Sequence, residues 1–374
     1  MTDIDLFDYE LPKELIAQSP AEPRDHSRLM ILDRQSGVIE HQQFFNIIDY
    51  IKEGDLLVMN DSKVFKARLE ARVGDRQIEV FLLRNHHPDR GPKGRVEGSN
   101  RIDPSTRLRL ARDGEINIAH DDNKKSLWTC LLKPGRKVKV GDELDFGEIK
   151  GVVQQKNDDG TVVIEMDKDF VQVLEFTQNH GQVPLPPYIT KELDDETKYQ
   201  TVYAKHVGSV AAPTAGFHFT PDLIENLKQK GIRIAYVTLH VGLGTFRPVK
   251  TQTLEEHEMH SEFVTISPET IEMIRQTKER YSRVIAVGTT SVRALEGAAP
   301  LESSGFTGDV NLFIRPGFEF QIVDAMITNF HLPKSTLLVL VSAFAGREKI
   351  IEAYKDAVQK KYRFFSFGDA MFIK

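Results

Sequence analysis

Histidines, glycines and hydroxyl-bearing residues gather in four short segments where a hydrophobic core would not require them. The segments, with the histidines that three of them contain, are 209–220 (His218), 238–247 (His240), 286–293 and 328–336 (His331). Imidazole accepts or donates a proton near neutral pH, and glycine lets a ligand approach the backbone closely. The segments therefore predict a binding or catalytic site. A tightly packed turn also explains the first segment, and a hydrogen-bonded structural histidine also explains the second.

The segment 286–293 has the pattern of a strand, a glycine, three hydroxyl residues and a helix. Backbone N–H groups at such a helix start, together with nearby hydroxyls, bind anions or carboxylates. The segment lacks the Gly-Lys-[Ser/Thr] of a P-loop, and Arg247 replaces the third glycine that a dinucleotide fingerprint would need after Gly242 and Gly244. The pattern therefore predicts an anion cradle, and an ordinary helix N-cap fits it equally well.

Two polar clusters lie nearer the N-terminus. The first cluster contains Arg24, Asp25, Ser27 and Arg28, and the second contains Asn60, Asp61 and Lys63. Charge clusters are usually solvated surface, so these residues are either functional or simply exposed.

Metal and disulfide chemistry find little support in the sequence. His257 and His260 lie three residues apart, a spacing that fits metal ligation on a helix, but neither a cysteine partner nor an H-E-x-x-H motif accompanies them. Cys130, the single cysteine, forms neither an intrachain disulfide nor an all-cysteine metal site. We therefore predict no metal.

The composition is that of a globular protein of about two or three domains, with 374 residues, 40% of them hydrophobic and 28% charged. The longest nearly apolar run, 337–345, is shorter than the roughly 20 residues of a membrane helix, and the acidic start lacks a signal-peptide pattern. We expect a cytoplasmic protein with no membrane partner.

The net charge is −6, but residues 60–150 hold 20 Lys and Arg against 15 Asp and Glu, so RNA would bind to a local patch.

Short strand-like runs without helical periodicity fill the segment 61–175, which indicates a small antiparallel β-barrel. The runs lie at 77–83, 106–111, 127–132, 143–146, 151–155 and 161–166. The segment 84–101 is rich in proline, glycine and charge, so we expect it to be an exposed insertion.

Strands and helices alternate in the remainder of the chain, which predicts a layered α/β domain. Strands are expected at 29–32, 56–59, 232–239 and 284–287, and helices at 221–230, 268–281, 291–296, 335–345 and 348–361, with Thr220, Ser267 and Ser335 as N-caps. Phe364 and Phe365 are expected in the core. The fold class is thus α/β and multi-domain: a large discontinuous layered α/β domain (1–60 and 176–374) with an inserted small antiparallel β-barrel domain (61–175).

Motifs spread over nearly the whole chain resemble one family, the S-adenosylmethionine:tRNA ribosyltransferase-isomerases of queuosine biosynthesis. The motifs lie at 9–12, 184–189, 199–203, 211–219, 238–245, 259–262, 288–293, 328–333 and 362–371. Together they are far more specific than any one of them. The architecture that the resemblance implies, a large α/β domain with an inserted barrel, agrees with the pattern above. The segment from 84 to 125 is longer than the family's barrel needs, and its role stays open.

The resemblance implies an unusual reaction, in which S-adenosylmethionine gives up its ribosyl moiety rather than its methyl group. The acceptor is the 7-aminomethyl group of 7-deazaguanine at the tRNA wobble position, and the products are epoxyqueuosine-tRNA, adenine and methionine. A base would form an ylide beside the sulfonium, and a donor would assist adenine departure. The methionine carboxylate needs donors, which the turn 288–291 or Arg293 would supply. We expect a monomer that needs no cofactor beyond S-adenosylmethionine as donor substrate.

The resemblance marks positions, and we assign roles to them as a hypothesis. Acid and base chemistry is assigned to His218, His240 and His331, with Asp25 and Glu262 as rival bases. Candidates for RNA phosphates or the acceptor base are Arg24, Arg28, Lys63 and Arg68. The other expected substrate-binding residues are Ser27, Asn60, Asp61, Tyr203, Thr214, Gly216, Gly242, Gly244, Thr245, Gly288, Thr289, Thr290, Ser291, Arg293 and Asn329.

Two other classes of protein compete with this interpretation. A methyltransferase that uses the same donor would release S-adenosylhomocysteine and no free adenine. A non-catalytic RNA-binding module fits the barrel and its basic bias, and would bind tRNA without S-adenosylmethionine. It would leave the histidine- and glycine-bearing segments unexplained.

Overall fold

The computed structural model describes residues 2–86, 125–191, 193–242 and 251–374. The chain divides into two compact units, Met1–Val64 with Pro184–Lys374, and Phe65–Val183. These bounds differ from the expected ones at 60/61 and 175/176. Strand β4 (Ser62–Val64) pairs with β11 (His206–Ser209) of the larger unit, and helix α2 (Phe170–His180) packs within the smaller one.

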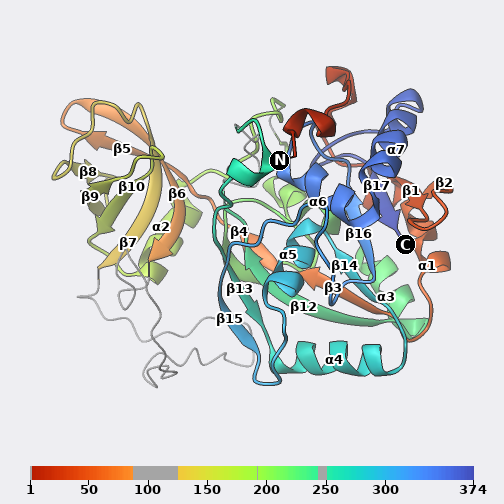
Figure 1. Ribbon diagram of the computed structural model, residues 1–374. Helices are drawn as coiled ribbons and strands as arrows, with labels where there is room; N and C mark the ends of the chain where they lie inside the picture. The colour runs from red at the N-terminus through yellow and green to blue at the C-terminus, as the bar shows by residue number, and fades with distance from the viewer. Residues whose placement is uncertain (1, 87–124, 192, 243–250) are drawn as a thin grey trace. The chain divides into compact units, whose positions relative to one another are not determined.

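A nine-stranded sheet forms the centre of the larger unit (Figure 1). Its strands in spatial order are β15 (Phe306–Val310), β13 (Glu262–Ile266), β12 (Arg233–His240), β3 (Leu56–Asn60), β14 (Val284–Val287), β16 (Ala325–Asn329), β17 (Ala370–Ile373), β1 (Arg28–Leu32) and β2 (Ile39–Gln43). The neighbours β12, β3, β14 and β16 are parallel, so their carboxyl ends meet at one edge, where ligands bind in open α/β sheets. Strand β17 pairs with β16 on one side and β1 on the other.

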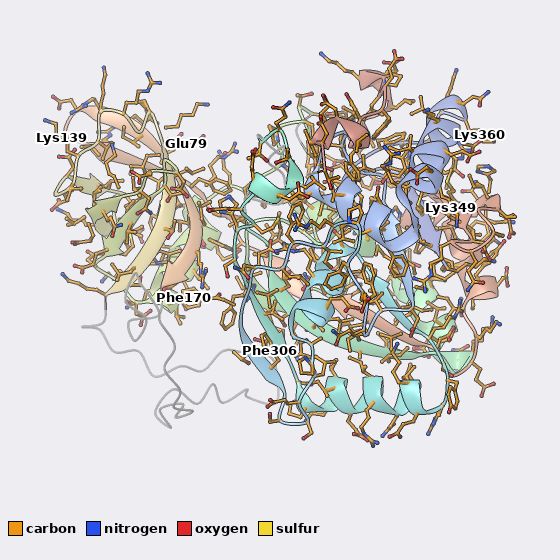
Figure 2. All side chains as sticks on the ribbon, in the orientation of Figure 1. Glu79, Lys139, Phe170, Phe306, Lys349 and Lys360 are labelled. Atoms are coloured by element: carbon orange, nitrogen blue, oxygen red, sulfur yellow. The ribbon has the colours of Figure 1, made fainter. Side chains whose placement is uncertain are left out.

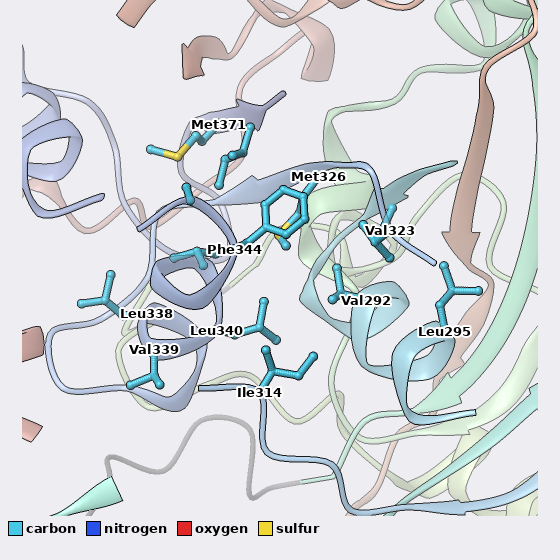
Figure 3. Packing of buried hydrophobic residues seen from close by; sticks show 14 of the residues in the cluster. Val292, Leu295, Ile314, Val323, Met326, Leu338, Val339, Leu340, Phe344 and Met371 are labelled. Atoms are coloured by element: carbon cyan, nitrogen blue, oxygen red, sulfur yellow. The ribbon is translucent and has the colours of Figure 1, made fainter. Parts of the chain in front are cut away.

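Helices cover both faces of this sheet, as the predicted layered α/β class requires. Helices α4 (Pro268–Glu279), α5 (Thr289–Gly297), α6 (Thr336–Ala345) and α7 (Arg347–Gln359) contribute to the core on one face, and α1 (Ile47–Tyr50) and α3 (Pro221–Gln229) to the core on the other. Figure 3 shows side chains of α5, α6 and β16, among them Val292, Leu340 and Met326, in the first of these cores. Within the described part of the chain, no helix has the length and apolarity that a bilayer crossing demands.

Six antiparallel strands close the smaller unit into the predicted barrel. Their order is β10 (Val162–Met166), β7 (Ser126–Lys133), β6 (Arg76–His86), β5 (Arg68–Val73), β8 (Glu143–Asp145) and β9 (Lys150–Lys156). Trp128 and Cys130 alternate with outward residues along β7 and are buried, whereas Lys139 extends from the outer surface (Figure 2). The strand expected at 106–111 lies outside the described residues, as does most of the segment 84–101.

Helix α2 is an element that the sequence analysis does not predict. The Asp169 side chain accepts a hydrogen bond from the backbone N–H of Gln172 at 2.8 Å, and the Gln172 side chain accepts one from the backbone N–H of Asp169 at 3.2 Å. This reciprocal capping box starts the helix at Phe170. The ring of Phe170 stacks on Trp128 at 5.5 Å between ring centroids, so α2 packs on the barrel.

The predicted N-caps of the larger unit are confirmed. The hydroxyls of Thr220, Ser267 and Ser335 each accept a backbone N–H hydrogen bond at 3.2 Å at the starts of α3, α4 and α6. Helix α5 differs, because it starts at Thr289 without a side-chain cap, two residues before the expected start. Single-turn 3-10 helices lie at Ile4–Phe7, Lys13–Leu15, Arg24–His26, Phe44–Asn46, Glu196–Tyr199, Thr214–His218 and Leu254–Glu256.

We expect Ser267→Ala to lower the free energy of unfolding of the larger unit by about 1 kcal/mol, because the N–H of Thr270 loses its acceptor. Ser267→Thr, which keeps the hydroxyl, should stay within about 0.5 kcal/mol of the parent. Urea unfolding followed by circular dichroism measures both. Equal stability of the alanine and threonine variants would show that the Ser267 hydroxyl does not stabilise the start of α4.

Candidate active site

A pocket lies in the larger unit at the carboxyl edge of β14 and β16. Its empty volume, including the part open to solvent, is about 760 Å³. Six residues predicted from the sequence line it: Thr214, Gly288, Thr289, Thr290, Asn329 and His331. None of the described residues that line the pocket is Asp, Glu, Lys or Arg. The pocket therefore presents helix ends, hydroxyls and rings rather than charged side chains.

The pairing of β14 with β16 sets the geometry of this pocket. Val287 pairs with Ile327, and the next residue, Gly288, donates its N–H to the carbonyl of Ile327 at 2.7 Å. Gly288 has a φ of +87°, a left-handed conformation that glycine adopts without strain. The chain turns there directly into α5. The residues at the start of α5 and the residues at the end of β16 thus line one cavity.

Two aromatic rings form another wall of the pocket. Tyr188 and Phe365 stack with their centroids 4.7 Å apart and an interplanar angle of 27°. The Tyr188 hydroxyl hydrogen-bonds to Ser366 Oγ at 2.8 Å, and burial raises the pKa of Tyr188 well above its usual value, so the phenol stays neutral. Phe365 has a φ of +69°, and its carbonyl accepts a hydrogen bond from Asn329 Nδ2 at 2.9 Å. A non-glycine residue in this conformation is strained, and such strain clusters at functional sites.

His331 is the predicted catalytic histidine that lines the pocket. Its Nε2 lies 3.0 Å from Thr328 Oγ1, its backbone N–H donates to the Tyr354 hydroxyl at 3.0 Å, and its carbonyl accepts from the Tyr9 hydroxyl. Burial lowers its pKa to about 3, so the ring is neutral at pH 7. A neutral imidazole held in this way offers a hydrogen bond to a ligand and is a weak base.

The other two predicted histidines do not line this pocket. His218, at the end of η7 (Thr214–His218), bonds through Nδ1 to Ser27 Oγ at 2.7 Å and stacks on Phe44 at 4.9 Å, and burial lowers its pKa to about 4. His240, at the end of β12, packs so closely on Gly208 that a Cβ there would lie 2.8 Å from its Cε1. Burial, with His206 nearby, lowers the pKa of His240 to about 4.

Glu262 and Arg293, predicted as a rival base and a carboxylate ligand, bind each other. Arg293 Nη1 donates to Glu262 Oε2, and both side chains are buried. The other carboxylate oxygen of Glu262 accepts from the N–H of Gly242 at 3.3 Å. Neither residue lines the pocket, so in this structure the pair joins α5 to β13.

The N-terminal arginines also bind the protein itself. Arg24 donates to the carbonyls of Thr197, Lys198 and Gln200, and burial lowers its pKa. Arg28 donates to the carbonyl of Lys360 at 2.7 Å, with its guanidinium 3.7 Å from the ring centroid of Tyr362. Asp25 accepts a hydrogen bond from the Thr220 hydroxyl at 2.9 Å. These contacts join the segment 24–28 to later segments of the larger unit.

The remaining predicted residues lie elsewhere in the described chain. Asn60 bridges to the backbone of Leu239, and Asp61 accepts from the Thr238 hydroxyl at 2.6 Å, with its pKa raised by burial. Ser291 donates to the Val287 carbonyl. Lys63 on β4 is exposed. In the barrel unit, Arg68 Nε lies 3.9 Å from Glu79 Oε2. Tyr203 and Gly216 contact each other. Gly244 and Thr245 lie outside the described residues.

His257 and His260 do not lie on a helix, where their spacing would fit metal ligation, because residues 257–260 form an irregular segment between η9 (Leu254–Glu256) and β13. In the described ranges, no group of three or more His, Cys, Asp or Glu side chains is placed to hold a metal ion.

Sequence reasoning missed several pocket residues. Phe365, expected in the core, is buried and also lines the pocket, with Ser366 beside it. Tyr188 lies in the motif 184–189 and Thr328 in the motif 328–333, but neither carries an ionisable group that marks it as functional at neutral pH. The sequence alone does not show that these motifs lie next to one another in the fold.

Parallel strands with a pocket at their carboxyl edge, and a barrel inserted in the chain, define a two-unit α/β enzyme. The family model "Queuosine biosynthesis protein" matches residues 4–373. Proteins from Thermotoga petrophila and Thermotoga maritima, both named S-adenosylmethionine:tRNA ribosyltransferase-isomerase, are 50% and 49% identical over 370 residues, which cover 98% of this chain and 98% of each of theirs. A crystal structure of S-adenosylmethionine tRNA ribosyltransferase from T. maritima has a TM-score of 0.54 and 41% identity, and covers 99% of this chain and 100% of its own.

The chain therefore belongs to the S-adenosylmethionine:tRNA ribosyltransferase-isomerase family of queuosine biosynthesis. The resemblance noted in the sequence is thus confirmed, and so is the assignment to an enzyme rather than to a non-catalytic module.

We expect Arg293→Met to destabilise the larger unit by about 3–5 kcal/mol, because it removes the cation that neutralises the buried carboxylate of Glu262. The double variant Glu262→Gln/Arg293→Met, which removes both charges, should recover much of this loss. Urea unfolding measures all three proteins. An unchanged stability of Arg293→Met, combined with a raised KM for S-adenosylmethionine, would instead favour Arg293 as a substrate ligand.

Stability should fall as the pH falls from about 6.5 to about 4, because unfolded histidine binds a proton in this window and buried His218 does not. The contribution of His218 is about 1.4 kcal/mol per pH unit. His218→Asn, which keeps an amide group near Ser27, should reduce the slope of unfolding free energy against pH by that amount. Identical slopes for the two proteins would show that His218 titrates normally in the folded state.

Proposed function

We propose that this enzyme transfers and isomerises the ribosyl moiety of S-adenosylmethionine onto the 7-aminomethyl group of 7-deazaguanine at the tRNA wobble position, giving epoxyqueuosine-tRNA, adenine and methionine. Membership of the family supports the reaction class, and the pocket at β14 and β16 supports a site for the donor. S-adenosylmethionine acts here as a substrate, and the proposal includes no further cofactor.

The composition of the pocket is the observation that carries this assignment. The pocket lies at the carboxyl edge of parallel strands, where ligands bind in open α/β sheets. The rings of Tyr188 and Phe365 provide a surface on which a purine can stack. The wall lacks carboxylates and basic side chains among its described residues, so the sulfonium would enter a site without a counter-charge. Loss of that charge, when the C5′–S bond breaks and methionine leaves as a thioether, is favoured in such surroundings.

His331 is the group that we assign to the leaving adenine. Its ring is neutral, and Thr328 holds Nε2 at 3.0 Å, which leaves Nδ1 to bond a ligand. A hydrogen bond to a purine nitrogen lowers the cost of breaking the bond between adenine and C1′. A pKa of about 3 makes His331 a poor base in the empty pocket, so a different group must remove the C5′ proton. Asp25, His218 and His240 do not line this cavity.

The competing methyltransferase reaction uses the same donor but breaks a different bond. Attack at the methyl carbon would leave adenine attached to the ribose, whereas ribosyl transfer releases it. The modified nucleoside would gain one methyl group instead of a ribosyl-derived ring. Binding of tRNA, a monomeric state and a cytoplasmic location remain predictions that accompany this proposal.

We expect purified enzyme, incubated with S-adenosylmethionine and tRNA that carries the deazaguanine precursor, to release adenine and methionine in equal amounts. Mass analysis of the nucleosides should show the ribosyl-derived product. His331→Ala should lower kcat for adenine release by about 100-fold, because the leaving group loses its hydrogen-bond partner.

His41→Ala is the matched control, since His41 bonds to Tyr362 and lies near Asp356, away from the pocket. It should keep kcat within about threefold of the parent. Transfer of a methyl group alone would refute the proposed reaction. Full activity of His331→Ala would remove His331 from it while leaving the reaction intact.

A further inference from the structure

The space over Gly288 is an open cradle at the start of α5. A Cβ built on Gly288 would lie 3.4 Å from Thr290 Oγ1 and 3.6 Å from Ala215 Cβ, and all three residues line the pocket. The absent side chain thus leaves room for a ligand group between a hydroxyl and a methyl. Any side chain at 288 would also be strained, because φ is +87°.

Hydrogen-bond donors converge on this cradle without partners. Thr290 is only 8% exposed, and its Oγ1 has no hydrogen-bond partner among the described residues. Helix α5 has nine residues, and its N-cap, Gly288, offers no side-chain acceptor to the first N–H groups of the helix. A buried hydroxyl beside an uncapped helix start attracts an anionic oxygen, because both the N–H groups and the helix dipole favour negative charge there.

The charges around the cradle restrict what can bind. The pocket wall carries no Asp, Glu, Lys or Arg among its described residues, and Arg293 of the same helix is bound to Glu262. A bare anion would therefore meet no cationic side chain, and a bare cation no carboxylate. A zwitterion, whose charges compensate each other, enters such a site at lower desolvation cost.

We propose that the N–H groups of α5 and the Thr290 hydroxyl form a carboxylate subsite that holds the methionine moiety of the donor and, after transfer, free methionine, which is thereby a competitive product inhibitor. This inference rests on the proposed function, which places S-adenosylmethionine in the pocket. On transfer the electron pair of the C5′–S bond stays on sulfur, and the moiety becomes a net-neutral zwitterion. Its carboxylate keeps the same hydrogen-bond donors. Methionine therefore stays in the pocket and competes with the next molecule of S-adenosylmethionine.

Calorimetric titration of the full-length protein with L-methionine and with methioninol, which lacks the carboxylate, tests the subsite without tRNA. Methionine should bind at least about tenfold more tightly than methioninol. Thr290→Val, which keeps the shape of the side chain, should weaken methionine about tenfold and leave methioninol unchanged. In the turnover assay, methionine should raise the KM for S-adenosylmethionine without changing kcat, and less so in Thr290→Val.

Thr336→Val is the matched control, because Thr336 is also a buried threonine in the first turn of a helix, α6, and does not line this pocket. It should bind methionine like the parent. Thr290→Ala, which also removes the hydroxyl, is a second variant that should weaken methionine if Thr290→Val folds poorly. Equal binding of methionine and methioninol, or unchanged methionine binding in both pocket variants, would overturn the subsite. Carboxylate-dependent methionine binding without adenine release would overturn the proposed reaction and support the subsite.

Discussion

The hydrogen bond from the Gly288 N–H to the Ile327 carbonyl, at 2.7 Å, fixes the arrangement on which the pocket depends. It extends the parallel pairing of β14 and β16 by one residue past the end of β14. The start of α5 and the segment that carries Asn329 and His331 are therefore neighbours. Because adjacent strands lie about 4.8 Å apart, groups from both can contact a single small molecule. The core behind them, shown in Figure 3, holds α5 and α6 against the sheet.

The larger unit satisfies most of its buried charges internally and leaves the pocket wall uncharged. Arg293 and Glu262 neutralise each other, and Arg24 and Arg28 bind backbone carbonyls. His218, His240 and His331 add no charge either, because burial lowers their pKa values and keeps their rings neutral at pH 7. Polar residues that look catalytic in the sequence thus serve partly to join distant segments. Thr290, whose Oγ1 has no hydrogen-bond partner among the described residues, lines the pocket, where a ligand would satisfy it.

Local sequence patterns predicted those features that local interactions decide. The apolar run of β14 and the caps Thr220, Ser267 and Ser335 depend on near neighbours, and the structure confirms them. The partner of Arg293 lies 31 residues away, and the ring that stacks on Tyr188 belongs to a segment far along the chain. Such contacts follow from sheet order, which single segments do not encode. For the same reason the sequence marked six pocket residues but did not separate them from His218 and His240.

The position of strand β17 in the sheet affects the order in which the two units can fold during synthesis. Residues 370–373 are fully buried and lie between β16 and β1, so β17, which follows the other described strands along the chain, is an interior member of the sheet. Until the ribosome has added it, β1 and β2 have no edge to join, because their link to the rest of the sheet runs through β17. The six barrel strands, in contrast, are complete by residue 166. The inserted unit can thus mature while the nascent chain is still growing, whereas the larger unit closes only after synthesis reaches β17.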